Sequence, residues 1–165
     1  MVLPDLVPEA QRLLSNLRER GFKLATAESC TGGLLAALFT EVAGASDVFE
    51  RGFVTYTNAA KIGQLGVDLD ILLRHGAVSA ETAAAMANGA LRCSAADVTL
   101  SVTGIAGPTG GTPDKPVGLV YLGHAFRGRP TQTRELRLGE DRTRSDVREK
   151  TVAEALALLR QSFGG

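Results

Sequence analysis

The sequence contains little that would direct it to a membrane, to nucleic acid or out of the cell. Its 165 residues include no tryptophan and only two cysteines, and 18 basic residues are balanced by 18 acidic ones. Without net charge, the chain has no long-range attraction to nucleic acid or anionic lipid. No run reaches the ~18 apolar residues of a membrane span, and the N-terminus lacks the basic and apolar regions of a signal peptide. We therefore expect a cytoplasmic protein without membrane or nucleic-acid partners.

Cysteine and histidine are too scarce for several common kinds of site. Cys30 and Cys93 cannot form the disulfide framework of a small secreted domain. The two histidines, His75 and His124, do not lie beside a candidate nucleophile in the sequence, so a histidine-dependent triad is not indicated. No group of Cys, His and Asp has the spacing of metal ligands, and we expect no metal site.

The rest of the composition is typical of a single globular domain. Hydrophobic residues make up 44% and charged residues 22% of the chain, which is close to the average for globular proteins. We expect one domain over residues 1–165. Basic residues are concentrated in the last quarter, but acidic residues alternate with them, which is typical of a solvated helix face and strand edge.

Hydrophobic spacing predicts alternating helices and strands, followed by a hairpin. The expected strands cover residues 22–27, 53–56, 98–102, 117–126 and 131–138, and the last two are expected to pair antiparallel. The expected helices cover 4–21, 34–44, a short segment capped by Asn58, 68–73, 80–93 after Ser79, and a final segment capped by Asp141 or Thr143. This order predicts an α/β fold with a mixed sheet and helices on both faces.

The first segment that could carry chemistry joins an expected strand to an expected helix at residues 27–33. A serine at such a turn, here Ser29, lies near unpaired helix N–H groups that can hold an oxyanion. Gly32 and Gly33 allow close approach of a ligand to the backbone. The simpler interpretation is that Ser29 or Thr31 only caps the helix.

Lys61 lies on a second strand-to-helix turn, after Tyr56. A buried lysine loses its charge more easily and can act as a base, although most lysines are exposed. With no histidine partner available, a Ser29–Lys61 pair is the most economical nucleophile and base, and Tyr56 could orient a proton. Cys30 is a rival nucleophile that we interpret as structural.

A long glycine- and proline-rich loop follows the strand at 98–102. Gly104, Gly107, Gly110 and Gly111 expose backbone amides that could hold a phosphate or carboxylate, although the loop matches no known phosphate-binding motif. Its length favours a function, since most connections have about 4–6 residues. Further along, Arg142 and Arg144 are either phosphate anchors or ordinary surface charges.

Together these segments resemble the CinA C-terminal domain family over nearly the whole chain. The matching runs are Thr26-Ala27-Glu28-Ser29-Cys30-Thr31-Gly32-Gly33, Arg51-Gly52-Phe53-Val54-Thr55-Tyr56-Thr57-Asn58 with Lys61, His75-Gly76-Ala77-Val78-Ser79, and Thr103-Gly104-Ile105-Ala106-Gly107-Pro108-Thr109-Gly110-Gly111 with Lys115-Pro116-Val117-Gly118.

The resemblance implies a three-layer α/β/α sandwich with a mixed, mostly parallel sheet. It also implies nicotinamide-nucleotide amidase activity, in which nicotinamide mononucleotide and water give nicotinate mononucleotide and ammonia in pyridine nucleotide salvage. By match, Ser29 is the nucleophile, Lys61 the base and Tyr56 an assistant. The expected substrate-binding residues are Cys30, Thr31, Gly32, Gly33, Thr103, Gly104, Gly107, Gly110 and Arg142.

The mechanism that follows requires no cofactor. We expect the amides of residues 30–33 to hold the oxyanion, and we expect a homodimer, the commonest assembly. Longer family members carry an additional N-terminal domain for which this chain has no room, so we expect the activity of that domain to be absent. Two alternatives stay open: a nucleotide-binding or competence- and damage-associated interaction protein without turnover, and an amidase for another phosphorylated amide.

Overall fold

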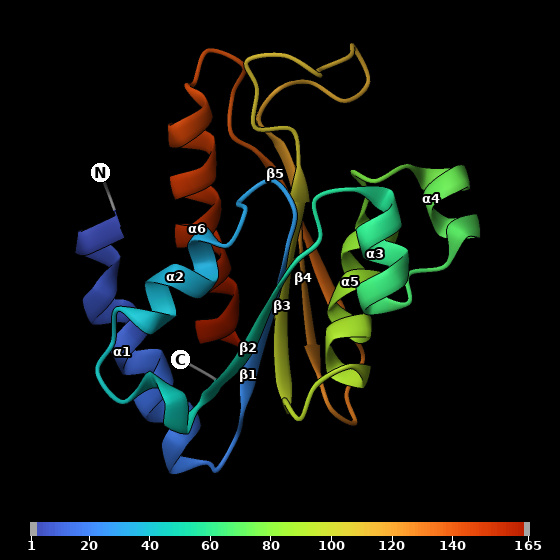
Figure 1. Ribbon diagram of the computed structural model, residues 1–165. Helices are drawn as coiled ribbons and strands as arrows, with labels where there is room; N and C mark the ends of the chain where they lie inside the picture. The colour runs from blue at the N-terminus through green and yellow to red at the C-terminus, as the bar shows by residue number, and fades with distance from the viewer. Residues whose placement is uncertain (1–2, 164–165) are drawn as a thin grey trace.

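Five strands form a single mixed sheet in the order β2-β1-β3-β4-β5 (Figure 1). In the computed structural model, which describes residues 3–163, β1 (Leu24–Glu28) pairs in parallel with β2 (Phe49–Val54) and β3 (Val98–Gly104). The strand β4 (Leu119–Phe126) pairs antiparallel with both β3 and β5 (Gln132–Arg137), which confirms the expected hairpin. Four strands therefore run in one direction and β4 runs against them.

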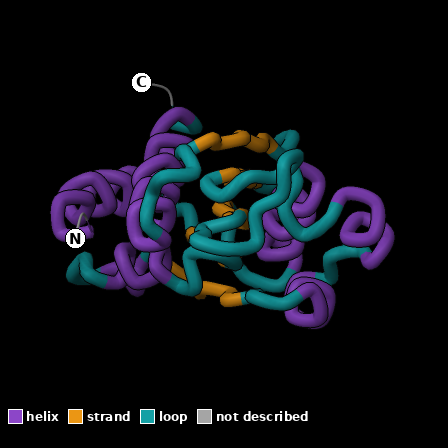
Figure 2. The backbone as a smooth tube through the Cα atoms, turned by 90° about the horizontal axis from the view of Figure 1, so that it is seen from above, coloured by secondary structure: helices purple, strands orange, loops and turns teal. Residues whose placement is uncertain are grey.

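Helices cover both faces of this sheet, so the expected α/β class is confirmed (Figures 1 and 2). One face is covered by α1 (Leu3–Glu19), α2 (Leu34–Thr40) and α6 (Arg144–Gln161). The other face carries α3 (Asn58–Leu65), α4 (Leu69–His75) and α5 (Ala80–Arg92). Among the described residues, no helix is long and apolar enough to cross a membrane.

The larger part of the core lies between the sheet and the layer of α1, α2 and α6. The α6 side chains Val147, Val152, Leu156 and Leu159 are buried in it. On the opposite face, α5 approaches β3 and β4 closely because most of its buried positions are alanine or glycine. A Cβ atom on Gly123 of β4 would lie 2.5 Å from the carbonyl oxygen of Ala83, so only glycine permits this approach.

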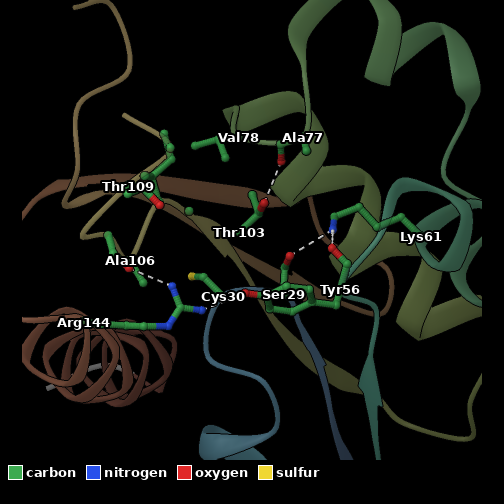
Figure 3. A pocket seen from close by; sticks show the side chains of 14 residues that line it. Ser29, Cys30, Tyr56, Lys61, Ala77, Val78, Thr103, Ala106, Thr109 and Arg144 are labelled. Atoms are coloured by element: carbon green, nitrogen blue, oxygen red, sulfur yellow. Dashed lines mark hydrogen bonds between the residues drawn. The ribbon is translucent and has the colours of Figure 1, made fainter. Parts of the chain in front are cut away.

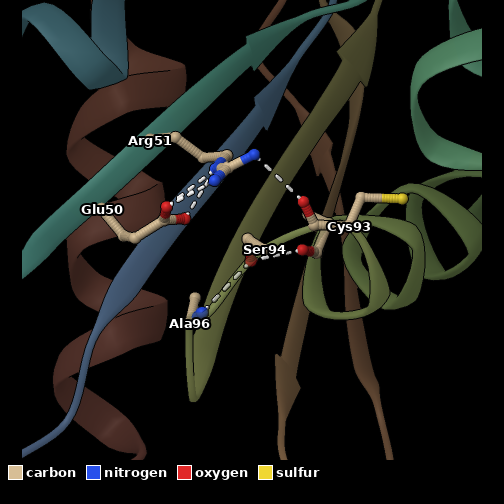
Figure 4. A network of polar contacts seen from close by, with 6 residues as sticks. Glu50, Arg51, Cys93, Ser94 and Ala96 are labelled. Atoms are coloured by element: carbon tan, nitrogen blue, oxygen red, sulfur yellow. Dashed lines mark hydrogen bonds and ion pairs between the residues drawn. The ribbon is translucent and has the colours of Figure 1, made fainter.

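The strand β2 is an edge of the sheet and is fastened to the turn between α5 and β3 (Figure 4). Arg51 pairs with Glu50 at 2.7 Å and also donates a hydrogen bond to the carbonyl oxygen of Cys93 at 3.2 Å. These charged side chains occupy the edge strand, where they discourage pairing with another chain.

Three expected element boundaries are wrong. The strand expected at 53–56 begins at Phe49 and ends at Val54, because its parallel pairing with β1 extends from Leu24 to Glu28. The strand expected at 22–27 is shifted to Leu24–Glu28 and is buried on both faces. The helix expected at 34–44 ends at Thr40, and Gly44, with φ of 75°, instead begins the short 3₁₀ turn Ala45–Asp47.

The expected helix caps are confirmed at two helices and wrong at one. Ser79 accepts a hydrogen bond from the N–H of Thr82, and Thr143, not Asp141, caps α6 in a reciprocal capping box. At α3 the cap is Thr57, whose hydroxyl accepts from the N–H of Ala60 at 3.1 Å. Asn58 is the first residue inside that helix.

Candidate active site

The carboxyl ends of the parallel strands β2, β1 and β3 meet at one edge of the sheet, where the candidate residues gather. Ser29 directly follows β1, and its N–H donates to the carbonyl oxygen of Val102 in β3 at 2.9 Å. Thr55 directly follows β2, and its N–H donates to the carbonyl oxygen of Glu28 at 2.8 Å. The strand ends are thereby aligned, and α3 returns Lys61 toward Ser29.

Lys61 and Ser29 form a buried hydrogen-bonded pair (Figure 3). The Lys61 side chain is 1% exposed, and its Nζ lies 2.9 Å from the Ser29 Oγ. The other contacts of Nζ are the carbonyl oxygens of Thr55 at 2.8 Å and Tyr56 at 3.4 Å. Burial lowers the pKa of Lys61, because the charged form loses its hydration.

The geometry around Nζ suits a neutral amine that acts as a base. A neutral lysine keeps two hydrogens, and the carbonyl oxygens of Thr55 and Tyr56 can accept both. The remaining lone pair then faces the Ser29 hydroxyl and can accept its proton. This is the arrangement that an activated serine nucleophile needs.

A cavity of about 270 Å³ opens beside this pair. Eight of its lining residues were expected from the sequence: Ser29, Cys30, Tyr56, Lys61, Thr103, Gly104, Gly107 and Gly110. Of the six other lining residues, Arg144 was a possible phosphate anchor, and Ile105, Ala106 and Thr109 lie in the glycine-rich loop that was expected to hold a ligand. Ala77 and Val78 were not expected, since small apolar side chains carry no chemical signal in a sequence.

Four residues expected to bind substrate lie outside the cavity lining: Thr31, Gly32, Gly33 and Arg142. The carbonyl oxygen of Thr31 accepts from Arg148, and the N–H of Gly32 donates to the carbonyl oxygen of Ser29. Arg142 donates to the carbonyl oxygen of Leu138. In this structure, therefore, these residues shape the surroundings of the cavity without lining it.

Arg144, the first residue of α6, is the arginine that reaches the cavity. It donates to the carbonyl oxygen of Gly107 at 2.9 Å and to the hydroxyl of Tyr56 at 2.7 Å. The Tyr56 hydroxyl is therefore directed to Arg144, while its backbone carbonyl meets Lys61. The tyrosine side chain is 57% exposed, at the rim of the cavity.

Glu28 is a buried carboxylate that the sequence reading did not identify. It is fully buried at the end of β1, and it accepts hydrogen bonds from the backbone N–H groups of Gly33, Leu35 and Ala36 at 2.8–3.1 Å. Thr26 adds its hydroxyl at 3.3 Å. Neither Ser29 nor Thr31 caps α2, since this carboxylate occupies its N-terminus from the preceding strand.

The position of Glu28 restricts which amides remain for an oxyanion. The N–H of Gly33 is bonded to Glu28 and that of Gly32 to Ser29, so neither can turn to a substrate. Among the described residues, no protein oxygen accepts a hydrogen bond from the N–H groups of Cys30 and Thr31. Of these two residues, only Cys30 lines the cavity, so its amide is the one left at 30–33 to stabilise a developing negative charge there.

Cys30 is placed as an inert thiol. It is 5% exposed, and burial raises its pKa to about 12. Because the thiolate is the nucleophilic form, a thiol with this pKa is unreactive at neutral pH. Ser29 is therefore the better nucleophile at this turn.

Neither histidine lines the cavity. His124 lies on β4, 4% exposed, with its Nε2 at 3.1 Å from the Ser162 hydroxyl. Burial, and to a smaller extent the charge of Arg129, lowers its pKa to about 4. Within residues 3–163, no three His, Cys, Asp or Glu side chains lie close enough together to bind a metal ion.

The low pKa of His124 predicts a loss of stability in mild acid. The unfolded chain binds a proton near pH 6.5, whereas the folded chain does so near pH 4, so acid favours unfolding between these values. We expect up to about 3 kcal/mol of unfolding free energy to be lost from this group between pH 6.5 and 4. Urea unfolding across this range should show a steeper decline for the wild type than for His124→Gln. Equal slopes for the two proteins would contradict the prediction.

Comparison with known proteins places the whole arrangement in one family. The profile of the CinA C-terminal domain matches residues 7–163. A putative competence-damage inducible protein of Symbiobacterium thermophilum is 52% identical over 98% of this chain, and a CinA-like protein of Kosmotoga olearia is 49% identical over 89%. The chain spans 39% and 35% of the lengths of these two relatives.

Solved structures agree over almost the full chain. The competence/damage inducible protein CihA from Agrobacterium tumefaciens has a TM-score of 0.92 at 47% identity, covering 95% of this chain and 94% of that one. A CinA superfamily protein from Escherichia coli has a TM-score of 0.88 at 35% identity, covering 93% and 87%. The chain, with its Ser29–Lys61 pair at the carboxyl edge of a five-stranded mixed sheet, belongs to the CinA C-terminal domain family.

Proposed function

We propose that this protein is an amidase that converts nicotinamide mononucleotide and water to nicotinate mononucleotide and ammonia. The observation that carries the proposal is the buried Lys61 Nζ at 2.9 Å from the Ser29 Oγ. Among the described residues, the contacts of this lysine are neutral oxygens, and burial lowers its pKa. A buried lysine without a carboxylate partner is a poor structural element and a good general base.

In the proposed reaction, Lys61 takes the proton of Ser29 while the serine oxygen attacks the carboxamide carbon. The amide of Cys30, which lines the cavity, stabilises the resulting oxyanion. When the C–N bond breaks, protonated Lys61 returns its proton to the leaving nitrogen, which departs as ammonia. Lys61 then deprotonates a water molecule that attacks the acyl-serine. As the acyl C–O bond breaks, Lys61 gives this proton to the Ser29 oxygen, and the carboxylic acid product leaves.

The electrostatics of the cavity support an anionic amide as substrate. Among the described residues that line it, Arg144 and Lys61 are basic and none is acidic. Lys61 is occupied by the catalytic role, which leaves the Arg144 guanidinium to attract a phosphate. The exposed amides of the glycine-rich loop, with Gly107 and Gly110 in the lining, suit phosphate oxygens as well.

The direct test is ammonia release from nicotinamide mononucleotide by the purified, metal-free protein. We expect the wild type to turn over and Ser29→Ala to lose at least about a thousandfold in kcat, because the attacking atom is removed. Ser15→Ala, on α1 away from the cavity, is the matched control and should behave as the wild type.

The outcomes separate the proposal from its alternatives. A Ser29→Ala variant as active as the wild type would overturn the mechanism. A wild type that binds the nucleotide without releasing ammonia would indicate a nucleotide-binding protein. A wild type that ignores this nucleotide but hydrolyses another phosphorylated amide would keep the chemistry and change the substrate.

A further inference from the structure

One wall of the cavity is a short backbone segment, His75–Val78, held almost entirely by side chains from other elements. Ala77 and Val78 of this segment line the cavity. Each of its four carbonyl oxygens accepts a side-chain hydrogen bond: His75 from Lys115 at 2.7 Å, Gly76 from Ser79 at 3.2 Å and Thr82 at 2.7 Å, Ala77 from Thr103 at 2.6 Å, and Val78 from Lys115 at 2.8 Å.

Lys115 comes from the glycine-rich loop, which supplies another part of the cavity lining through Thr109 and Gly110. The loop presents this lysine from a closed turn. The N–H of Thr112 donates to the carbonyl oxygen of Lys115 at 2.8 Å, and the N–H of Lys115 donates to the Thr112 hydroxyl at 3.1 Å. The stem of the lysine is therefore anchored before its Nζ reaches the wall.

The fit around the Lys115 Nζ is close. A Cβ atom on Gly76 would lie 3.1 Å from it, at a residue whose φ of 77° already favours glycine. The ammonium thus bridges the two ends of the wall segment, His75 and Val78. Charge-assisted hydrogen bonds of this kind are roughly twice as strong as neutral ones.

We propose that Lys115 is a positioning residue that fixes the glycine-rich loop against the His75–Val78 wall and thereby sets how tightly the cavity holds its substrate. This inference rests on the proposed amidase function. Lys115 touches neither Ser29 nor Lys61, which are held by β1, α3 and the carbonyl oxygens after β2. Its loss should therefore weaken substrate binding and leave the chemical step largely intact.

The kinetic test compares Lys115→Met with the wild type. Methionine keeps an unbranched apolar stem and removes the cation, so we expect KM to rise about tenfold or more and kcat to stay within about threefold. Lys115→Arg keeps a cation near the same carbonyls and should recover part of the loss. Lys150→Met, on the exposed side of α6, is the matched control and should leave both constants unchanged.

A second measurement, amide hydrogen exchange, does not depend on turnover. Without the Lys115 ammonium between the two segments, backbone amides of Lys115→Met should exchange faster than those of the wild type in the loop at 105–112. The same should hold for residues 75–82, which comprise the wall and the start of α5, while β1 keeps its protection. Unchanged exchange in both segments, or a fall in kcat with unchanged KM, would overturn the proposal. Faster exchange in a protein that releases no ammonia would instead sustain the bridge and refute the amidase.

Discussion

Lys61→Arg is expected to lose about 10²–10⁴-fold in kcat for ammonia release, although it preserves the positive charge. Arginine cannot be deprotonated in a protein, so it cannot accept the proton of Ser29 that Lys61 faces at 2.9 Å. Loss of a positioned general base has an effect of this size. The exposed Lys150→Arg serves as control, and a Lys61→Arg variant with more than a tenth of wild-type kcat would exclude lysine as the base.

If Lys61 is the base, kcat/KM of the wild type should depend on pH in a characteristic way. The base must be neutral to act, so activity is low while Lys61 is protonated and rises with pH as it loses its proton. Because burial lowers the pKa of Lys61, the rise should level off below the ~10.4 of an ordinary lysine. A profile of kcat/KM that still climbs through that value would show that this lysine is not the titrating base.

Glu28→Ala is expected to remove about 3–5 kcal/mol of unfolding free energy. The change leaves three backbone N–H groups at the start of α2 without their acceptor inside the protein, and each buried unsatisfied donor costs about 1–3 kcal/mol. Glu28→Gln should be intermediate, since its amide oxygen can still accept while its NH₂ group faces two donors. Urea unfolding measures the difference.

An exposed glutamate provides the control for this prediction. Glu19→Ala, at the end of α1, should change stability by less than about 0.5 kcal/mol. A Glu28→Ala variant that loses less than about 1 kcal/mol would mean that the helix start is satisfied in another way. Because Ser29 follows Glu28 directly, we also expect the alanine variant to lose amidase turnover.

The contact between Ser29 and Lys61 could be predicted because strand-to-helix turns after neighbouring parallel strands converge at one edge of a sheet. Ser29 and Lys61 both lie on such turns, and the structure brings them into contact. Glu28 could not be predicted in the same way, since an acidic residue at a strand end usually faces water. Its role depends on the path of α2 back across β1, which is a tertiary feature.

The sequence also could not decide which of Arg142 and Arg144 reaches the cavity. Both lie beside the cap of α6, and the sequence offered Asp141 or Thr143 for that cap. With Thr143 as the cap, Arg144 becomes the first helical residue and reaches Gly107 and Tyr56, whereas Arg142 turns back to Leu138. A shift of two residues in a helix start therefore decides which guanidinium enters the cavity.

The cavity can be completed only late in synthesis, because α6, the last helix, supplies two of the contacts that shape it. Arg144 holds the carbonyl oxygen of Gly107, and Arg148 holds that of Thr31 in the turn after Ser29, at 2.8 Å. A nascent chain contains Ser29 and Lys61 long before it contains these two arginines. The cavity is therefore completed only after α6 has left the ribosome and docked, so a chain cut short before it would carry Ser29 and Lys61 without a formed site.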